Sequence, residues 1–158
     1  MTIAELGSVG EFLGAILLFV SLIYLGIQIR QSNKAERLSA TVAFEDQYRQ
    51  NLSLWASSDE ISNVMAKGLS DMSSLTKSEV HLFGPRMYSL YRHAETAFQQ
   101  NKKRLLEDDV LSRTMRVVSL YHDEPGAQAW YADHGRYMLT QEFCTFLDTY
   151  MLNLKDNS

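Results

Sequence analysis

The chain has 158 residues, which suffice for one compact domain with one attached segment but not for two sizeable domains. Its formal net charge of −4 comes from 15 basic and 19 acidic side chains, and this mixed balance excludes a general nucleic-acid binder, which needs a dense basic face. The single cysteine, Cys144, cannot form an internal disulfide and is typical of a reducing compartment.

The first element along the chain is an apolar segment at residues 9–29, of which residues 12–29 read FLGAILLFVSLIYLGIQI. A helix of this length, rising about 1.5 Å per residue, crosses a hydrocarbon layer about 30 Å thick. Glu5 and Glu11 come first, whereas a cleaved signal peptide begins with basic residues. We therefore expect a retained transmembrane helix at residues 9–29 behind a short external tail at residues 1–8. A buried helix of a globular core is the alternative.

Positive charges lie on only one side of this apolar segment. Arg30, Lys34 and Arg37 follow it directly, and no lysine or arginine precedes it. Basic residues that flank a membrane helix remain in the cytoplasm, so we expect the N-terminus outside and the following domain inside. This pattern predicts a single-pass inner-membrane protein with a cytoplasmic C-terminal domain.

Small and polar residues recur on one face of the same segment. This face, the anchor stripe, consists of Gly7, Gly10, Gly14, Ser21 and Gln28. Gly10 and Gly14 form a pair of small residues four apart, which lets two helix backbones approach closely in lipid. We therefore predict that the anchor stripe is the interface of a homo-oligomer. Glu11 lies on the same face, either at the headgroup level near the positive end of the helix or in contact with a pore or partner.

The helical pattern continues beyond the apolar segment, because neither glycine nor proline interrupts the chain again before Trp55. We expect one long helix to leave the membrane as a juxtamembrane stalk at residues 30–57. A helical domain at residues 58–158 should pack on this stalk. The predicted fold class is all-α, with one N-terminal transmembrane helix that continues into a cytoplasmic helical bundle.

Local signals place the helices of this domain. Thr76 and Glu79 have the spacing of a capping box, which starts a long helix. The apolar face of that helix comprises Val80, Phe83, Met87, Leu90, Tyr91, Ala94 and Phe98. Acidic residues 107–109 suit the start of a further helix, Pro125 suits the first position of the next, and Thr140 is expected to cap the last.

The sequence lacks the motifs of a catalytic or metal centre. No Glu-x-x-His pair, the motif of di-iron helical bundles, occurs at any of the four histidines. Cys144 lies on the apolar side of the last predicted helix, without a local base or cation to activate its thiol. Tyr88, Tyr91, Tyr131 and Tyr137 fit core or interface positions, with a ligand pocket as the alternative.

These observations favour a function outside catalysis, so we assign no enzyme activity, cofactor, metal ligand or catalytic residue. The favoured interpretation is a membrane-anchored, homo-oligomeric helical assembly or accessory protein. Its expected partners are the lipid bilayer, further copies of itself and, as a further option, another membrane protein. The alternative is an ion channel formed by the N-terminal helices, with Glu11 and Gln28 as polar rings at its two mouths.

Two stretches resemble an abundant family of small bacterial membrane proteins. They are SVGEFLGAILLFVSLIYLGIQIRQSNKA at residues 8–35, and EPGAQAWY at residues 124–131 together with QEF at residues 141–143. Ala127 and Tyr131 depart from the family pattern, which has a second glycine and a second tryptophan there. The resemblance implies an N-terminal anchor, a helical domain and a bacterial inner membrane. It implies no activity, ligand or catalytic residue.

Overall fold

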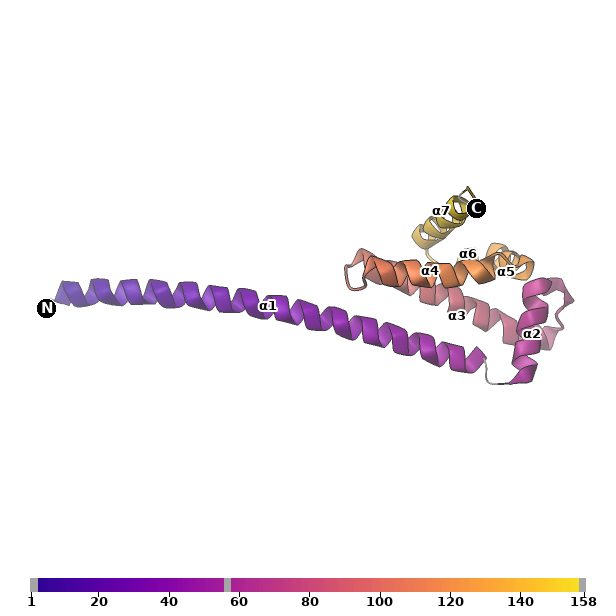
Figure 1. Cartoon of the computed structure of the whole chain (residues 1–158), viewed down its shortest axis with the longest axis horizontal. Helices are drawn as coiled ribbons and strands as arrows, with labels where there is room; N and C mark the ends of the chain where they lie inside the picture. The colour runs from indigo at the N-terminus through magenta and orange to yellow at the C-terminus, as the bar shows by residue number, and fades with distance from the viewer. Residues whose placement is uncertain (1–2, 56–57, 157–158) are drawn as a thin grey trace. The chain divides into compact units, whose positions relative to one another are not determined.

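The structure, a computed structural model, describes residues 3–55 and 58–156. Within these residues every regular element is helical, so the predicted all-α fold class is confirmed (Figure 1). The chain divides into two compact units, Met1–Ser39 and Ala40–Ser158. The helices are α1 (Ile3–Trp55), α2 (Asp59–Ser70), α3 (Lys77–Lys102), α4 (Asp108–His122), α5 (Pro125–Trp130), α6 (Arg136–Met138) and α7 (Gln141–Asp156).

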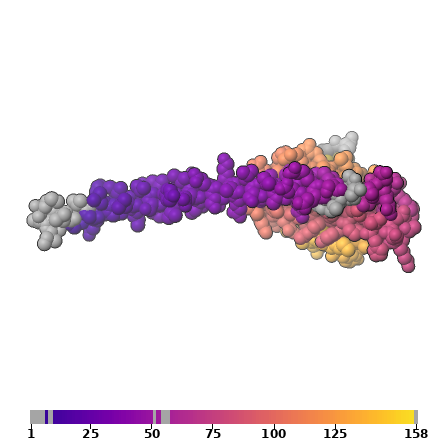
Figure 2. Space-filling model, turned by 90° about the horizontal axis from the view of Figure 1, so that it is seen from below, coloured from indigo at the N-terminus to yellow at the C-terminus, as the bar shows by residue number. Residues whose placement is uncertain are grey.

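The first unit consists of the N-terminal part of α1, and every side chain at residues 10–39 is exposed (Figure 2). Within Gly10–Gln50, α1 is long and apolar enough to cross a membrane by length and composition, and an 18-residue stretch of it has a mean hydropathy of 2.3. The predicted apolar N-terminal helix is therefore confirmed. The ranges predicted for the membrane segment and the stalk fall in this one helix, apart from residues 56 and 57, which lie outside the described residues.

The second unit begins with the last turns of α1 and continues through α2 and the 3₁₀ turn Met72–Ser74 into α3. The capping box that starts α3 is confirmed. The Glu79 amide donates to Thr76 Oγ1 at 3.3 Å, and the Thr76 amide donates to Glu79 Oε2 at 2.7 Å. Lys67 Nζ of α2 donates to the same carboxylate oxygen at 2.8 Å, which ties α2 to the start of α3.

The starts of α4 and α5 also agree with the sequence. Helix α4 begins at Asp108 in the acidic run, and Pro125 is the first residue of α5. A π-helical turn, Tyr131–Gly135, connects α5 to α6. Thr140 precedes α7, and both its amide and its hydroxyl donate to the carboxylate of Glu95 on α3.

The core of the second unit lies where α3, α4, α5 and α7 meet. Its fully buried large side chains are Phe83, Met87, Tyr91, Met115, Val118, Phe143 and Leu147. The predicted apolar face of α3 thus points inward, except that Val80, at its N-terminal end, is 43 % exposed. Cys144 is buried, as expected for a core residue. Phe44 of α1 packs separately on Ala97, Leu106 and Val110, which joins the end of α1 to α3 and α4.

Candidate functional site

The residues predicted as an oligomer interface all lie in the first unit, on α1. At about 3.6 residues per turn, Gly7, Gly10, Gly14, Ser21, Gln28 and Glu11 fall within an arc of about 100° around the helix. The space in front of the three glycines is open, because no atom lies within 4 Å of a Cβ placed on them. Ser21 Oγ donates to the Leu17 carbonyl and Gln28 Nε2 donates to the Tyr24 hydroxyl, each at 2.7 Å.

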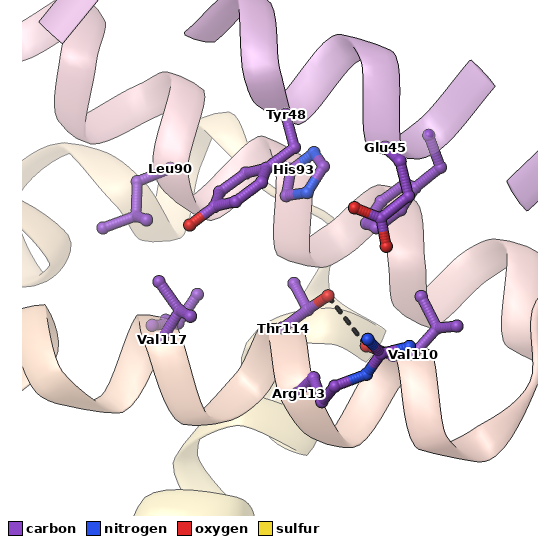
Figure 3. A pocket seen from close by; sticks show the side chains of 10 residues that line it. Glu45, Tyr48, Leu90, His93, Val110, Arg113, Thr114 and Val117 are labelled. Atoms are coloured by element: carbon purple, nitrogen blue, oxygen red, sulfur yellow. Dashed lines mark hydrogen bonds between the residues drawn. The ribbon is translucent and has the colours of Figure 1, made fainter. Parts of the chain in front are cut away.

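A pocket of about 150 Å³ lies in the second unit, lined by the C-terminal part of α1 together with α3 and α4. We call it the His93 pocket. Its walls are Phe44, Glu45, Tyr48, Leu90, His93, Val110, Arg113, Thr114, Val117 and Val118. Figure 3 shows Glu45, Tyr48 and His93 on one side of the gap, and the α4 side chains Arg113, Thr114 and Val117 on the other.

His93 is the most unusual side chain of this pocket, because it is polar but only 7 % exposed. Its ring stacks on Phe44, with centroids 4.0 Å apart, and on Tyr48, with centroids 5.0 Å apart. Its buried Nδ1 has no hydrogen-bond partner among the described residues. Burial lowers the pKa of His93 to about 4, so the imidazole is neutral at pH 7.

Charged side chains lie around the pocket rather than in its centre. Arg113 is exposed and pairs with Asp109 through an Nε to Oδ2 distance of 3.2 Å. Glu45 is half-buried on the opposite wall. Thr114 Oγ1 donates to the Val110 carbonyl at 2.8 Å, so its oxygen remains able to accept a hydrogen bond. The pocket therefore has an apolar interior and one neutral imidazole, with the charged side chains of Glu45 and Arg113 at its edge.

A second group of polar side chains, which includes the buried Tyr91 and Tyr131, is bonded internally. Tyr91 Oη and His122 Nδ1 are 2.8 Å apart, and Tyr131 Oη donates to Asp148 Oδ1 at 3.2 Å. Arg136 donates to the other Asp148 oxygen at 2.7 Å. Because these groups bond one another between α3, α4, the π-helical turn and α7, the cluster stabilises the fold.

The sequence did not reveal the His93 pocket. The neighbouring acidic residue Glu95 does not belong to the pocket, since it bonds Thr140 and Arg92. The pair Phe44 and Tyr48 could have indicated the pocket wall, because these aromatic residues lie four apart on the stalk and therefore share a helix face. Of the tyrosines singled out from the sequence, Tyr91 and Tyr131 are core residues, whereas Tyr137 is exposed.

The described residues contain no group of three His, Cys, Asp or Glu side chains that could hold a metal ion. No protein-family model matches the chain, and neither a curated protein nor a solved structure matches it. The geometry of the two sites, the anchor stripe and the His93 pocket, therefore supplies the arguments about function.

Proposed function

We propose that this chain is a membrane-anchored, homo-oligomeric helical assembly or accessory protein. The observation that carries the proposal is the N-terminal part of α1, where residues 12–29 are strongly apolar although all of them are exposed. An apolar surface of this extent is costly in water and is stable in a hydrocarbon layer. Its polar groups at Ser21 and Gln28 are bonded within the helix, as a lipid environment requires.

The proposed location is the inner membrane of a bacterium, with the N-terminus outside and the second unit in the cytoplasm. The support for this orientation is the group Arg30, Lys34 and Arg37, which follows the apolar segment, and the absence of any lysine or arginine before it. The second unit would then present its helices to cytoplasmic or membrane partners.

Assembly is proposed to occur through the anchor stripe. Two helices in lipid gain no hydrophobic energy from meeting, so they associate where small residues allow close van der Waals contact. Gly7, Gly10 and Gly14 offer such a surface, because nothing occupies the space in front of them.

The test compares Gly14→Leu with Gly26→Leu in full-length protein reconstituted in lipid, using native mass measurement. Gly14 lies within the stripe, whereas Gly26 lies about 120° farther around the helix and also has open space before it. We expect the parent and Gly26→Leu to be oligomeric and Gly14→Leu to be at least about tenfold weaker in assembly. A monomeric parent, or equal behaviour of the two variants, would overturn the proposal.

The second candidate function is an ion channel, which is favoured by Glu11 and Gln28 near the two ends of the stripe. Its weakness is that Leu18 and Leu25 lie on the same arc between them and would close a narrow pore by dewetting. Glu11→Gln should leave assembly intact. A change of cation conductance in this variant would favour the channel over the structural assembly.

A further inference from the structure

We propose that the His93 pocket binds a small, uncharged ring compound with one hydroxyl or N–H group that hydrogen-bonds to the His93 imidazole. This inference is independent of the anchor, because all ten lining residues belong to Ala40–Ser158. The proposed binding site therefore does not depend on whether the chain forms an oligomer.

The size of the pocket sets the size of the ligand. Its volume is about 150 Å³. A cavity of this volume lined by apolar side chains accommodates a benzene-sized molecule. A smaller hollow of about 30 Å³ shares Tyr48, Leu90, His93 and Val117 with it, so the two lie on adjoining sides of the same residues. One six-membered ring with a short substituent fits this space.

The lining sets the polarity of the ligand. Phe44, Leu90, Val110, Val117 and Val118 make the walls largely apolar. A charged ligand would lose its hydration there without a buried countercharge to replace it. The charged side chains of Glu45 and Arg113 stay more exposed than the imidazole, and Arg113 already pairs with Asp109.

His93 supplies the polar contact. Because the Nδ1 atom is fully buried, the hydrogen bond of the ligand is proposed to form with the other ring nitrogen, Nε2, of this pocket-lining side chain. The neutral imidazole has one donor and one acceptor nitrogen, and either tautomer can meet a hydroxyl group. Stacking on Phe44 and Tyr48 holds the ring in place, so the site is formed before the ligand arrives.

The probes for the test are phenol and toluene, which have the same size and differ in one hydroxyl group. Full-length protein in lipid nanodiscs is labelled at valine methyls and histidine ring nitrogens and titrated with each compound by NMR. We expect saturable shifts of Val110, Val118 and His93, with phenol bound about tenfold more tightly than toluene. Equal affinities for phenol and toluene would contradict the proposed hydrogen bond to His93. If neither compound shifts these resonances, the proposed binding site is wrong.

Two variants locate the site. Val117→Phe fills the pocket and should abolish the valine shifts, whereas Leu120→Phe, at a position of α4 that is 73 % exposed, should bind like the parent. His93→Phe keeps an aromatic ring in the stack but has no polar nitrogen, so it should bind both probes and lose the tenfold preference. If Val117→Phe retains the parent's shifts, or His93→Phe retains the preference, the compounds bind elsewhere and the proposal is wrong.

Discussion

Two buried ionisable side chains of α3, His93 and Glu95, adapt to burial in opposite ways. Burial alone raises the pKa of Glu95, but hydrogen bonds from Thr140 and the charge of Arg92 outweigh it and leave the pKa below its usual value. His93 has no such partner, and burial lowers its pKa to about 4. At pH 7 the carboxylate is therefore charged and bonded, while the imidazole is neutral with an unmet nitrogen.

The Thr140 hydroxyl is predicted to stabilise the fold by joining α7 to α3. Thr140 Oγ1 donates to Glu95 Oε1 at 2.6 Å, and Glu95 is fully buried. Thr140→Val removes this donor and should lower the free energy of unfolding by about 1–3 kcal/mol, which thermal denaturation followed by circular dichroism would measure. Thr149→Val is the control, because its exposed hydroxyl only donates to the Thr145 carbonyl of its own helix. Equal losses in the two variants would contradict the prediction.

Acid is predicted to destabilise the second unit partly through His93. Between about pH 6.5 and pH 4 the unfolded chain protonates this histidine and the folded chain does not, so stability falls as the pH falls. His93→Phe removes this contribution and should show a smaller loss of Tm between pH 7.5 and pH 5. Part of the dependence should remain, because burial also lowers the pKa of His122. An identical loss of Tm in the parent and in His93→Phe would mean that His93 does not contribute to the pH dependence of stability.

The contact between α2 and α5 depends on Gly126. A Cβ on Gly126 would lie 1.8 Å from the carbonyl oxygen of Gly68, so the α5 backbone can accept no side chain there. Gly126→Ala should cost about 3 kcal/mol or more, or prevent folding, as measured by thermal denaturation. Gly84→Ala is the matched control within α3. Its Cβ would meet only Trp130 Nε1 at 3.7 Å. Gly84→Ala should therefore change stability much less than Gly126→Ala, because the better helix propensity of alanine is offset by its unfavourable position before Pro85. Similar stabilities for the two variants would rule out the close approach.

The elements that the sequence predicts are those specified by neighbours three or four residues apart. Thr76 and Glu79 mark the start of α3 by a local reciprocal hydrogen bond, and Pro125 starts α5 because its fixed φ suits a first turn. The contact of Thr140 with Glu95 joins residues 45 apart, so local periodicity could not predict it. The His93 pocket depends on how three helices are placed around it, which is likewise beyond a single-helix pattern.

At the scale of the whole molecule, the free energy of the exposed apolar part of α1 decides the environment of the chain. Each buried methylene gains about 0.8 kcal/mol, and the segment has large apolar side chains at most positions between Phe12 and Ile29. We therefore predict that this segment inserts into a bilayer. Sodium carbonate at high pH should leave the protein in the membrane fraction, from which only detergent releases it.

The last prediction concerns the orientation proposed for the chain in the membrane, and it follows from the three basic residues directly after the apolar segment. Because Arg30, Lys34 and Arg37 resist transfer across the membrane, a fluorescent protein fused to the C-terminus should fold and fluoresce in the cytoplasm. Alkaline phosphatase fused at the same position should be inactive, since it requires an oxidising compartment.

Replacing the three basic residues together by glutamine, while adding lysines before Glu5, reverses the charge bias, so that the positive charges precede the apolar segment. This variant should shift the population toward phosphatase activity and lose fluorescence. The matched control changes the exposed Lys102 and Lys103, which lie far along the chain from the apolar segment, and should keep the parent's orientation. An active C-terminal phosphatase in the unaltered chain would show that the second unit lies outside the cytoplasm, and the proposed orientation would be wrong.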